Sequence, residues 1–285
     1  MEKLKIAIQK SGRLSEKSLD IITEAGINLV NGSRKLISIS SNFPMEILYL
    51  RDDDIPQYVA DGVADAGIVG ENVLIESGHN LEILERLGFA RCRLSLAVPK
   101  SVDYRGPEYF AGKKIATSYP NILRNYLSGN NIPAEIHVIN GSVEIATGIG
   151  LADAIFDIVS SGSTLISNGL KEVEQVMGSE ALLLASPLMN KIKKEIAGEF
   201  IFRLRTVLAA RNNKYILLNA PNNKLEQIIS LLPGMKSPTV LPLALEGWSS
   251  VHSVVNENEF WQVIGKLREY GAEGILVIPI EKMMV

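Results

Sequence analysis

The stretch DIVSSGSTL, residues 157–165, indicates more about this fold than any other part of the sequence. Its branched apolar residues are typical of a short buried strand, its small residues form a tight loop, and the apolar run that follows can begin a helix. A strand, a small-residue loop and a helix N-terminus together present backbone N–H groups and hydroxyls to a phosphate. The alternative is an ordinary turn in which Ser or Thr caps the helix.

An acidic residue, Asp157, stands directly before this loop. A phosphate pocket does not require a carboxylate, but one placed there can hold ribose hydroxyls or orient a Mg²⁺ ion bound to the phosphate. The stretch therefore suggests a ligand that carries both a sugar and a phosphate. The candidate binding residues are Asp157 and the loop residues Ser160, Ser161, Gly162, Ser163 and Thr164.

The sequence contains an internal repeat of this region. GVADAGIVG, residues 62–70, resembles GLADA at 150–154 followed by IFDIV at 155–159. In each copy a helix ends at Gly, and Ala-Asp-Ala opens an apolar strand that leads to a small-residue loop. We interpret the copies as two lobes of related design, although Ala-Asp-Ala can also recur by chance. Because ligands of open α/β sheets bind beyond the carboxyl ends of strands, two such lobes predict a cleft.

Apolar runs alternate with amphipathic stretches along the chain, which predicts a mostly parallel sheet with helices on its faces. Strands are expected at residues 4–9, 36–40, 45–50 and 66–69, with helices at 15–25, 54–61 and 191–210. Asp54 is expected to cap the second of these helices, and a turn is expected around Glu71. Residues 92–99 and 181–187 are the candidate links between the lobes.

From residue 215 a second alternation of apolar runs and amphipathic stretches begins. Strands are expected at 215–220, 239–242, 251–255 and 275–279, with helices at 224–231 and 260–270. This strand-helix-strand-strand-helix-strand order is that of a ferredoxin-like unit, and about 70 residues suffice for one small domain.

Composition limits the possible functions. A length of 285 residues allows two or three domains, and 46% hydrophobic with 21% charged residues is ordinary for a globular protein. The net charge of −3 gives no nucleic-acid footprint, so anionic ligands must be bound by locally placed cations. The candidate cations are Lys10, Arg13, Arg51, Arg91 and Arg93.

Single residues and segments bear on disulfides, metal sites and cellular location. The lone cysteine, Cys92, excludes an intrachain disulfide framework and is expected to be a small buried residue in a strand. The three histidines lack metal-ligand spacing. The charged start enters a strand within five residues, which is unlike a signal peptide, and no apolar run approaches about 18 residues. We expect a cytoplasmic protein without membrane contact.

The string from Glu144 through Gly162 to Leu165 resembles the signature of the ATP phosphoribosyltransferase family, the first enzyme of histidine biosynthesis. Further segments are similar to motifs of the same family: QKSGRL at 9–14, RDDDIP at 51–56, GENV at 70–73, CRLS at 92–95, ATSYP at 116–120, NGSVE at 140–144 and PIEKM at 279–283. The resemblance runs from about residue 5 to the end. The length fits the long form, which carries its own regulatory domain, whereas the short form depends on a partner subunit.

The resemblance implies a reaction and a fold. N1 of the ATP adenine attacks C1 of the ribose of phosphoribosyl pyrophosphate, and pyrophosphate leaves; Mg²⁺ travels with phosphoribosyl pyrophosphate and has no dedicated protein site. The fold is a bilobal α/β core like the type II periplasmic binding proteins, followed by a ferredoxin-like, ACT-like regulatory domain that binds histidine. The expected divisions are residues 1–92 with 182–211, residues 93–181, and residues 212–285.

The resemblance also implies functional residues and partners, but no general base. Besides Asp157 and its loop, substrate contacts are expected from Lys10, Arg13, Asp52, Glu71, Glu144 and Asp153. Histidine contacts are expected from Asn219, Thr239 and Gly274. Histidine is the inhibitor, AMP is a competitor, and the family forms homodimers and hexamers.

For several of these residues a structural role is an open alternative to ligand contact. Asp153 can instead serve at the start of its strand, and Glu144 can form a capping box with Gly141 and Ser142. The acidic run 52–54 can cap a helix, and Tyr119 can stack on a ligand or pack in the core or a hinge. A bilobal binding module and a silent regulatory homologue are the competing functions. The first leaves the acidic residue before the phosphate loop unexplained, and the intact candidate residues argue against the second.

Overall fold

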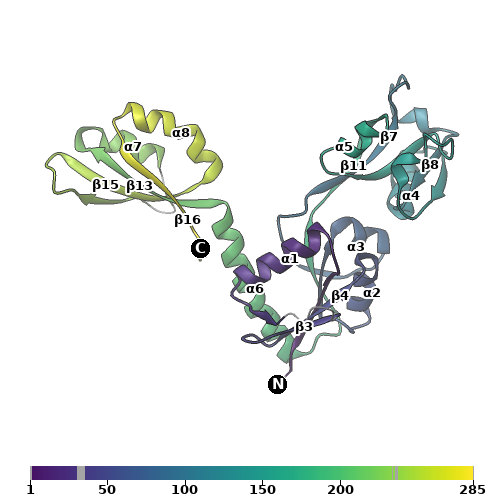
Figure 1. Cartoon of the computed structure of the whole chain (residues 1–285), viewed down its shortest axis with the longest axis horizontal. Coiled ribbons are helices and arrows are strands. Elements are labelled where there is room, and N and C mark those ends of the chain that lie inside the picture. Colours follow the sequence, from purple (N-terminus) through teal and green to yellow (C-terminus); the bar gives the residue numbers. More distant parts are fainter. Residues whose placement is uncertain (1, 31–35, 233, 235–236, 285) are drawn as a thin grey trace. The chain divides into compact units, whose positions relative to one another are not determined.

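The computed structural model describes residues 2–30, 36–232, 234 and 237–284. The chain forms two compact units, Met1–Thr23 with Ile27–Gly198, and Glu24–Gly26 with Glu199–Val285 (Figure 1). The first unit contains two sheets, each with its own helices. We call the part built on the seven-stranded sheet the first lobe and the part built on the five-stranded sheet the second lobe.

The first lobe is organised around a mostly buried apolar strand. β1 (Leu4–Gln9) pairs in parallel with β4 (Met45–Leu50) and β5 (Ala66–Gly70), and β12 (Ala181–Ala185) pairs antiparallel with β5. The sheet is completed by β2 (Leu29–Val30), β3 (Ile37–Ser40) and β6 (Glu82–Arg86), in the order β2-β3-β4-β1-β5-β12-β6. Its helices are α1 (Arg13–Glu24), the 3₁₀ turn η1 (Asp52–Asp54), α2 (Ile55–Ala60) and α3 (Glu71–Ser77). Apolar residues run almost continuously through β1 because parallel strands have both faces covered.

Close packing of a helix on this sheet depends on one glycine. A Cβ atom built on Gly67 in β5 would lie 2.7 Å from Ile55 Cγ2 and 2.8 Å from Val59 Cγ2. Both neighbours are fully buried side chains of α2 that cannot move aside freely. The helix can therefore approach the strand only where the side chain is absent.

The second lobe repeats the design with fewer strands. Its strands are β7 (Cys92–Pro99), β8 (Lys114–Thr117), β9 (Glu135–Val138), β10 (Ala154–Val159) and β11 (Leu170–Ser179), in the order β11-β7-β10-β8-β9. β8 is parallel to β9 and β10, whereas β7 is antiparallel to β10 and β11. Its helical segments are η2 (Pro107–Phe110), α4 (Pro120–Gly129), η3 (Val143–Ile145) and α5 (Ser163–Ser167).

The repeated Ala-Asp-Ala sequence has the same structural role in both lobes. The Oδ2 atom of Asp65 accepts a hydrogen bond from the backbone N–H of Lys5 at 2.8 Å, and Oδ2 of Asp153 accepts one from Lys114 at 2.9 Å. Each aspartate thus ties the start of its own strand to the start of the parallel neighbour, β1 or β8. The internal sequence repeat is therefore also a structural repeat, as predicted.

The chain passes between the two lobes twice, at residues 87–91 and at Glu180. The segments expected to make these links, 92–99 and 181–187, contain β7 and β12, whose apolar side chains are buried in the two sheets. Each of these strands buries five consecutive residues, which favours a strand covered on both faces over an exposed crossing. The links are the short segment 87–91, in which Leu87 and Phe89 are buried, and Glu180.

Helix α6 (Lys191–Arg211) follows the second passage, close to the predicted 191–210. Its first turn is attached to the first lobe, since Lys193 Nζ lies 2.9 Å from Asp65 Oδ1. Both partners are largely buried, so this ion pair is less screened by solvent than most in the chain.

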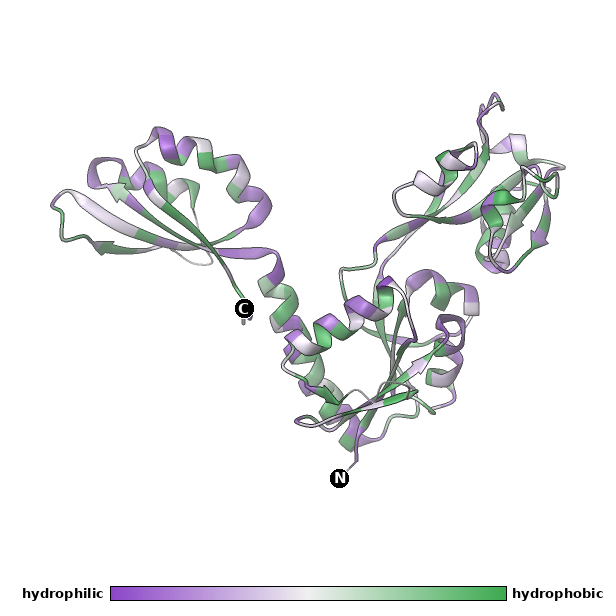
Figure 2. Cartoon of the chain, in the orientation of Figure 1, coloured by the Kyte–Doolittle hydropathy of each residue, from purple (hydrophilic) through white to green (hydrophobic). Residues whose placement is uncertain are grey.

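The second unit ends in the predicted ferredoxin-like fold. Its elements are β13 (Asn213–Pro221), η4 (Asn222–Lys224), α7 (Leu225–Leu231), β14 (Thr239–Pro242), β15 (Trp248–Asn256), α8 (Glu257–Glu269) and β16 (Glu273–Pro279). The strands form an antiparallel sheet in the order β14-β15-β13-β16, and α7 and α8 cover one of its faces (Figure 1). Figure 2 shows apolar residues recurring along the strands of this sheet, where Ile216, Leu218 and Val251 are fully buried.

Two local predictions in the first lobe are wrong. Asp54 occupies the N-cap position of α2 but its side chain makes no capping hydrogen bond, because η1 already continues helical geometry into α2. The turn expected at Glu71 is the start of α3, which ends at Gly78 with a φ of 71°. Of the helices in the described residues, none has the length and apolar composition needed to cross a lipid bilayer.

Candidate functional site

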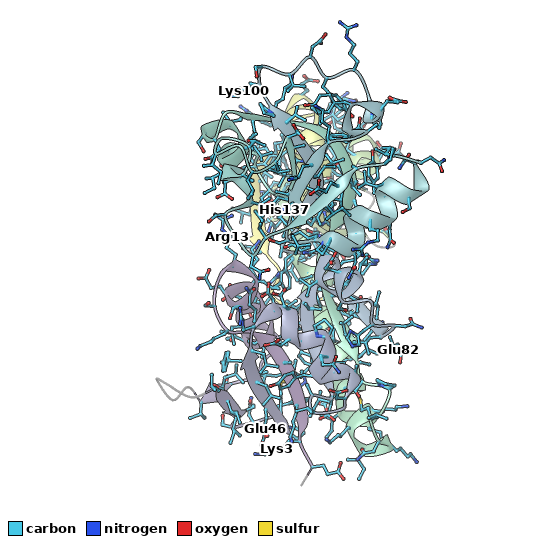
Figure 3. All side chains as sticks on the ribbon, turned by 90° about the vertical axis from the view of Figure 1, so that its right-hand side faces the viewer. Lys3, Arg13, Glu46, Glu82, Lys100 and His137 are labelled. Carbon is cyan, nitrogen blue, oxygen red and sulfur yellow. The ribbon has the colours of Figure 1, made fainter. Side chains whose placement is uncertain are left out.

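A cavity of about 350 Å³ lies between the two lobes of the first unit. Its walls come from the carboxyl ends of strands in both lobes and from the first crossing, and they comprise Gln9, Arg13, Leu14, Lys17, Asp52, Gly70, Asn72, Val73, Ala90, Arg91, Cys92, Tyr119, Ile158 and Ser160. Arg13 lies at the end of the first lobe that faces the second, whereas Lys3 and Glu46 lie at the opposite end (Figure 3). Loops that follow parallel strands collect at one edge of each sheet, which is why residues distant in sequence meet here.

The predicted phosphate loop forms one rim of this cavity through Ser160. It follows β10, and Gly162 adopts a φ of 78° immediately before α5. The hydroxyls of Ser161 and Ser163 lie 2.9 Å apart. The backbone turn therefore brings hydroxyls and the first N–H groups of α5 close together, as a phosphate requires.

Arg93 supports the loop from behind. Its Nη1 donates a hydrogen bond to the carbonyl oxygen of Ser160 at 3.1 Å, while Nε and Nη2 both donate to the carboxylate of Glu172. Ser95 donates a further hydrogen bond to Glu172 at 2.7 Å. Arg93 is one of the cations that the sequence makes available to anionic ligands, but these contacts give it a structural partner and a structural role.

Asp157 is a partly buried carboxylate at the carboxyl end of β10. Burial raises the pKa of Asp157 to about 6; the backbone N–H of Ile158, which donates to Oδ1 at 2.8 Å, opposes the rise, and the charge of Glu144 adds to it. The two carboxylates thus lie within electrostatic reach of each other. Acceptors in this arrangement suit the hydroxyls of a sugar or a divalent cation.

The acidic segment η1 contributes one residue to the cavity wall. Asp52 lines the cavity, and burial followed by the charge of Asp52 raises the pKa of Asp53. Across the cavity, burial followed by the charges of Asp157 and Asp52 raises the pKa of Tyr119. Side chains of both lobes therefore share one negative field. Tyr119 both lines the cavity and packs against the hydrophobic core of the second lobe, so ligand contact and core packing are compatible for this residue.

This negative field would suit a divalent cation such as Mg²⁺. The described residues contain no group of three or more His, Cys, Asp or Glu side chains arranged to hold a metal by themselves. Mg²⁺ commonly uses one or two carboxylates and completes its shell with water and substrate phosphates. Asp52 and Asp157 are the carboxylates, one from each lobe, whose charges act on Tyr119.

Two predicted substrate contacts lie elsewhere or are already engaged. Asp153 lies at the opposite end of β10 from Asp157, bonded to the backbone of Lys114, as the strand-start alternative anticipated. Glu71 accepts hydrogen bonds from Arg86 at 2.6 and 3.0 Å, and these bonds are the main reason that the pKa of Arg86 is raised.

Lys10 and Glu144 are not among the residues that line the cavity. Lys10 is exposed directly after β1, where its backbone N–H donates to the carbonyl oxygen of Leu50 at 2.7 Å. Glu144 lies in the three-residue η3, and the Ser142 side chain makes no capping hydrogen bond there, so the capping box is not formed.

Asn72 and Ser179 form a buried pair at the second crossing that no sequence pattern predicts. The Ser179 hydroxyl accepts a hydrogen bond from the backbone N–H of Asn72 at 3.1 Å and donates to Asn72 Oδ1 at 2.8 Å. A Cβ atom on Gly70 would lie 2.5 Å from Asn72 Oδ1, so this position requires glycine. The partners are 107 residues apart in sequence, and only the GENV string pointed to one of them.

Two of the predicted regulatory residues meet in the second unit. Gly274 has a φ of 58°, and a Cβ atom built there would lie 3.3 Å from Asn219 Nδ2. Thr239 lies in β14, which β15 and β13 separate from β16. Within one chain, therefore, Asn219 and Gly274 are neighbours and Thr239 is apart from them.

Comparison with known proteins decides the family. A family model described as ATP phosphoribosyltransferase matches residues 51–206, and one described as HisG, C-terminal domain, matches residues 210–282. The ATP phosphoribosyltransferase of Phocaeicola vulgatus is 61% identical over 282 residues, which cover 99% of this chain and 100% of that protein. The chain belongs to the ATP phosphoribosyltransferase family. It is therefore an enzyme of histidine biosynthesis, of the long form with a C-terminal regulatory domain.

Other ATP phosphoribosyltransferases agree with this assignment. The protein of Cytophaga hutchinsonii is 59% identical over 281 residues, covering 99% of this chain and 98% of that protein. Among solved structures, the ATP phosphoribosyl transferase (HisG:HisZ) complex from Thermotoga maritima matches with a TM-score of 0.62 and 30% identity, covering 71% of this chain and 96% of that chain. The family, the enzyme class and the fold class predicted from the sequence are confirmed.

Proposed function

We propose that the cavity between the lobes binds phosphoribosyl pyrophosphate and ATP together, so that N1 of adenine displaces pyrophosphate from C1 of the ribose. The observation that carries this proposal is the phosphate-type loop after β10, which meets Arg13 and Asp52 of the first lobe across one cavity. The reaction forms the N1–C1 bond and breaks the bond from C1 to the pyrophosphate oxygen.

The second lobe holds the ribose 5′-phosphate and the ribose. The loop hydroxyls and N–H groups bind the phosphate, and Asp157, with Glu144 behind it, accepts hydrogen bonds from the ribose hydroxyls. The loop turn at Gly162 and the partly buried Asp157 carboxylate support these roles. Residues Ser160, Ser161, Gly162, Ser163 and Thr164 make up the phosphate-binding loop in this proposal.

The first lobe and the crossing supply cations for the phosphates. Arg13 and Lys17 line the cavity, and Lys10 directly follows β1. Positive charge develops at C1 while negative charge develops on the leaving pyrophosphate, so positioning and charge stabilisation matter more than a covalent nucleophile. We assign no general base. The Arg86 ion pair makes Glu71 a weaker candidate for adenine or ribose contact than Asp52.

Phosphoribosyl pyrophosphate would carry a Mg²⁺ ion, which would supply neutralisation of the charge on the leaving pyrophosphate. Asp52 and Asp157 orient it, since both lie in the shared negative field that raises the pKa of Tyr119.

We propose that the chain divides into three domains, residues 1–92 with 182–211, residues 93–181, and residues 212–285. The change from the seven-stranded to the five-stranded sheet and back falls within a residue or two of the boundaries at 92/93 and 181/182, which supports this division.

The C-terminal domain binds histidine and inhibits the enzyme from a distance. The close approach of Asn219 to Gly274 supports a small-ligand site at that end of β13 and β16, whereas Thr239 would have to contribute from another copy or not at all.

The enzyme works in the cytoplasm and assembles as dimers and hexamers. Histidine shifts the equilibrium between these assemblies by linkage, and AMP competes with the substrates.

The direct test is pyrophosphate release from phosphoribosyl pyrophosphate in the presence of ATP and Mg²⁺. Asp157→Ala and Thr164→Val should each lower turnover by about a hundredfold or more, because each removes a polar contact to the reacting substrate. Circular dichroism must stay native. Near-normal turnover in either folded variant would remove the loop from the site, and binding without pyrophosphate release would indicate a binding module.

A further inference from the structure

Helix α4 begins in the second lobe without a cap of its own. Its N-cap residue is Tyr119, whose side chain makes no capping hydrogen bond, and Pro120 at the first helical position has no N–H. The backbone N–H groups of Asn121 and Ile122 are the donors that a capping side chain normally satisfies.

A carboxylate of the first lobe takes that place. Glu76 in α3 accepts a hydrogen bond from the Asn121 N–H at 2.8 Å through Oε1, with Oε2 3.1 Å away, and its Oε2 accepts one from the Ile122 N–H at 3.0 Å. The Asn121 side-chain amide donates to the carbonyl oxygen of Glu76 at 2.9 Å. The negative charge also complements the positive end of the α4 dipole.

This cap joins two elements that each form a wall of the cavity. Tyr119, directly before α4, lines the cavity, and its backbone N–H donates to Thr117 Oγ1 at 2.8 Å. The other end of α3 supplies Asn72 and Val73 to the same cavity. The contact is therefore a connection between the lobes other than the two covalent crossings.

We propose that Glu76 is a positioning residue that caps α4 across the lobes and keeps the substrate cavity assembled before substrate arrives. The inference rests on the proposed function of that cavity. Removing the cap lowers the fraction of free enzyme with an assembled cavity, and the apparent affinity for substrate falls by the same fraction. Bound substrate restores the arrangement, so turnover at saturation is retained.

The first experiment tests the cap itself in the full-length enzyme without substrate. Glu76→Ala and Glu76→Gln both keep a good helix former in α3, so that helix is not weakened. The matched control is Glu82→Gln, because Glu82 is an exposed glutamate in β6 of the same lobe (Figure 3). By hydrogen exchange, the amides of Asn121 and Ile122 should exchange about threefold to tenfold faster in Glu76→Ala than in wild type or Glu82→Gln. Unchanged exchange would overturn the proposal.

The second experiment measures steady-state kinetics of the same variants. KM for phosphoribosyl pyrophosphate should rise about threefold to tenfold in Glu76→Ala and less in Glu76→Gln, which keeps one acceptor oxygen, while kcat stays within about twofold. A fall in kcat at constant KM, or faster exchange with unchanged KM, overturns the positioning role. Failure of the proposed function is separate, since it shows as normal kinetics in Asp157→Ala whatever the exchange result.

Discussion

Asp157 combines burial with a charge that the proposed chemistry needs. Burial raises the pKa of Asp157 to about 6, so the free enzyme holds an ionised carboxylate at neutral pH in an environment that disfavours it. Residues selected for binding often cost the free protein stability. Asp153, four positions earlier on the same strand, shows the contrasting case, since its carboxylate is satisfied by a backbone N–H.

Asp157→Asn should stabilise the protein at neutral and alkaline pH. The folded-state pKa lies above the unfolded value of about 3.9, so the wild type loses stability as the pH rises from about 4 to about 6, and the loss persists above that range. Asparagine removes the charge with little change of shape. We expect a gain of up to about 2 kcal/mol at pH 8 that disappears near pH 4.

Thermal unfolding of wild type and Asp157→Asn at several pH values measures this difference. Asp20→Asn is the control, because Asp20 is an exposed residue of α1 and its replacement should leave stability within about 0.5 kcal/mol. Equal stability of Asp157→Asn and wild type at pH 8 would show that Asp157 is not destabilised by burial.

The same titration should appear in catalysis. With the pKa of Asp157 at about 6, the carboxylate becomes protonated below that pH and can no longer accept hydrogen bonds from two ribose hydroxyls. kcat/KM for phosphoribosyl pyrophosphate should therefore fall about tenfold per pH unit below about pH 6. A profile that is flat between pH 8 and pH 5 would separate Asp157 from the rate.

Arg13 tests the first lobe at the residue scale. It is exposed within the cavity wall, at the start of α1, where a planar guanidinium can bind two phosphate oxygens at once. Arg13→Lys keeps the charge but loses that fork, so kcat/KM should fall about tenfold. Arg105→Lys is the control, since Arg105 is an exposed residue paired with Asp103. Equal kinetics for the two variants would make Arg13 an ordinary surface residue.

At the scale of elements, the loop after β10 depends on its backbone as much as on its hydroxyls. Gly162 adopts a φ of 78°, a region that alanine enters only at a cost, yet the nearest atom to an added Cβ is Val159 Cγ1 at 3.9 Å. Space is available, and the conformation is the obstacle. Any change there must bend the loop rather than fill a gap.

Gly162→Ala should therefore raise KM for phosphoribosyl pyrophosphate by about tenfold and destabilise the protein by about 1 kcal/mol. Gly112→Ala is the matched control, because Gly112 has a φ of 70° and nothing within 4 Å of an added Cβ, before β8 in the same lobe. The control should lose similar stability but keep its KM. If both variants keep normal KM, the loop conformation does not set phosphate affinity.

At the scale of the whole molecule, the two units have different roles. The first unit carries the substrate cavity between its lobes, and the second carries a ferredoxin-like fold with its own buried core. A ligand that binds only the second unit can inhibit only by shifting an equilibrium of the enzyme, for which a few kcal/mol of coupling suffice.

A chain truncated after Arg211 should lose histidine inhibition. The cut lies at the end of α6, before β13, and leaves the residues of the cavity in place. Pyrophosphate release and calorimetric histidine binding measure the two properties. In the full chain, Gly274→Ala should weaken histidine inhibition without changing KM, because the added Cβ would crowd Asn219. Histidine inhibition of the active truncated chain at the full-length level would contradict the regulatory assignment.

Secondary structure was predictable because its signals are local. Apolar runs marked β1, β4 and β14 with their observed bounds, and the strand-helix order from residue 215 specified the ferredoxin-like fold. The errors occurred where two local readings compete. Glu71 follows a strand and small residues, which suits a turn, but the apolar residues after it pack as α3 in the first lobe.

The family, the order of elements and the phosphate-type loop could be predicted from the sequence, because these features depend on residues close together in the chain. Tertiary structure alone decided which candidate side chains are free. It attached Arg93 to Glu172, Glu71 to Arg86 and Glu76 to α4, pairs separated by 79, 15 and 45 residues. A charged side chain looks the same in sequence whether its partner is a ligand or the protein, since the partner is chosen only when distant strands and helices meet.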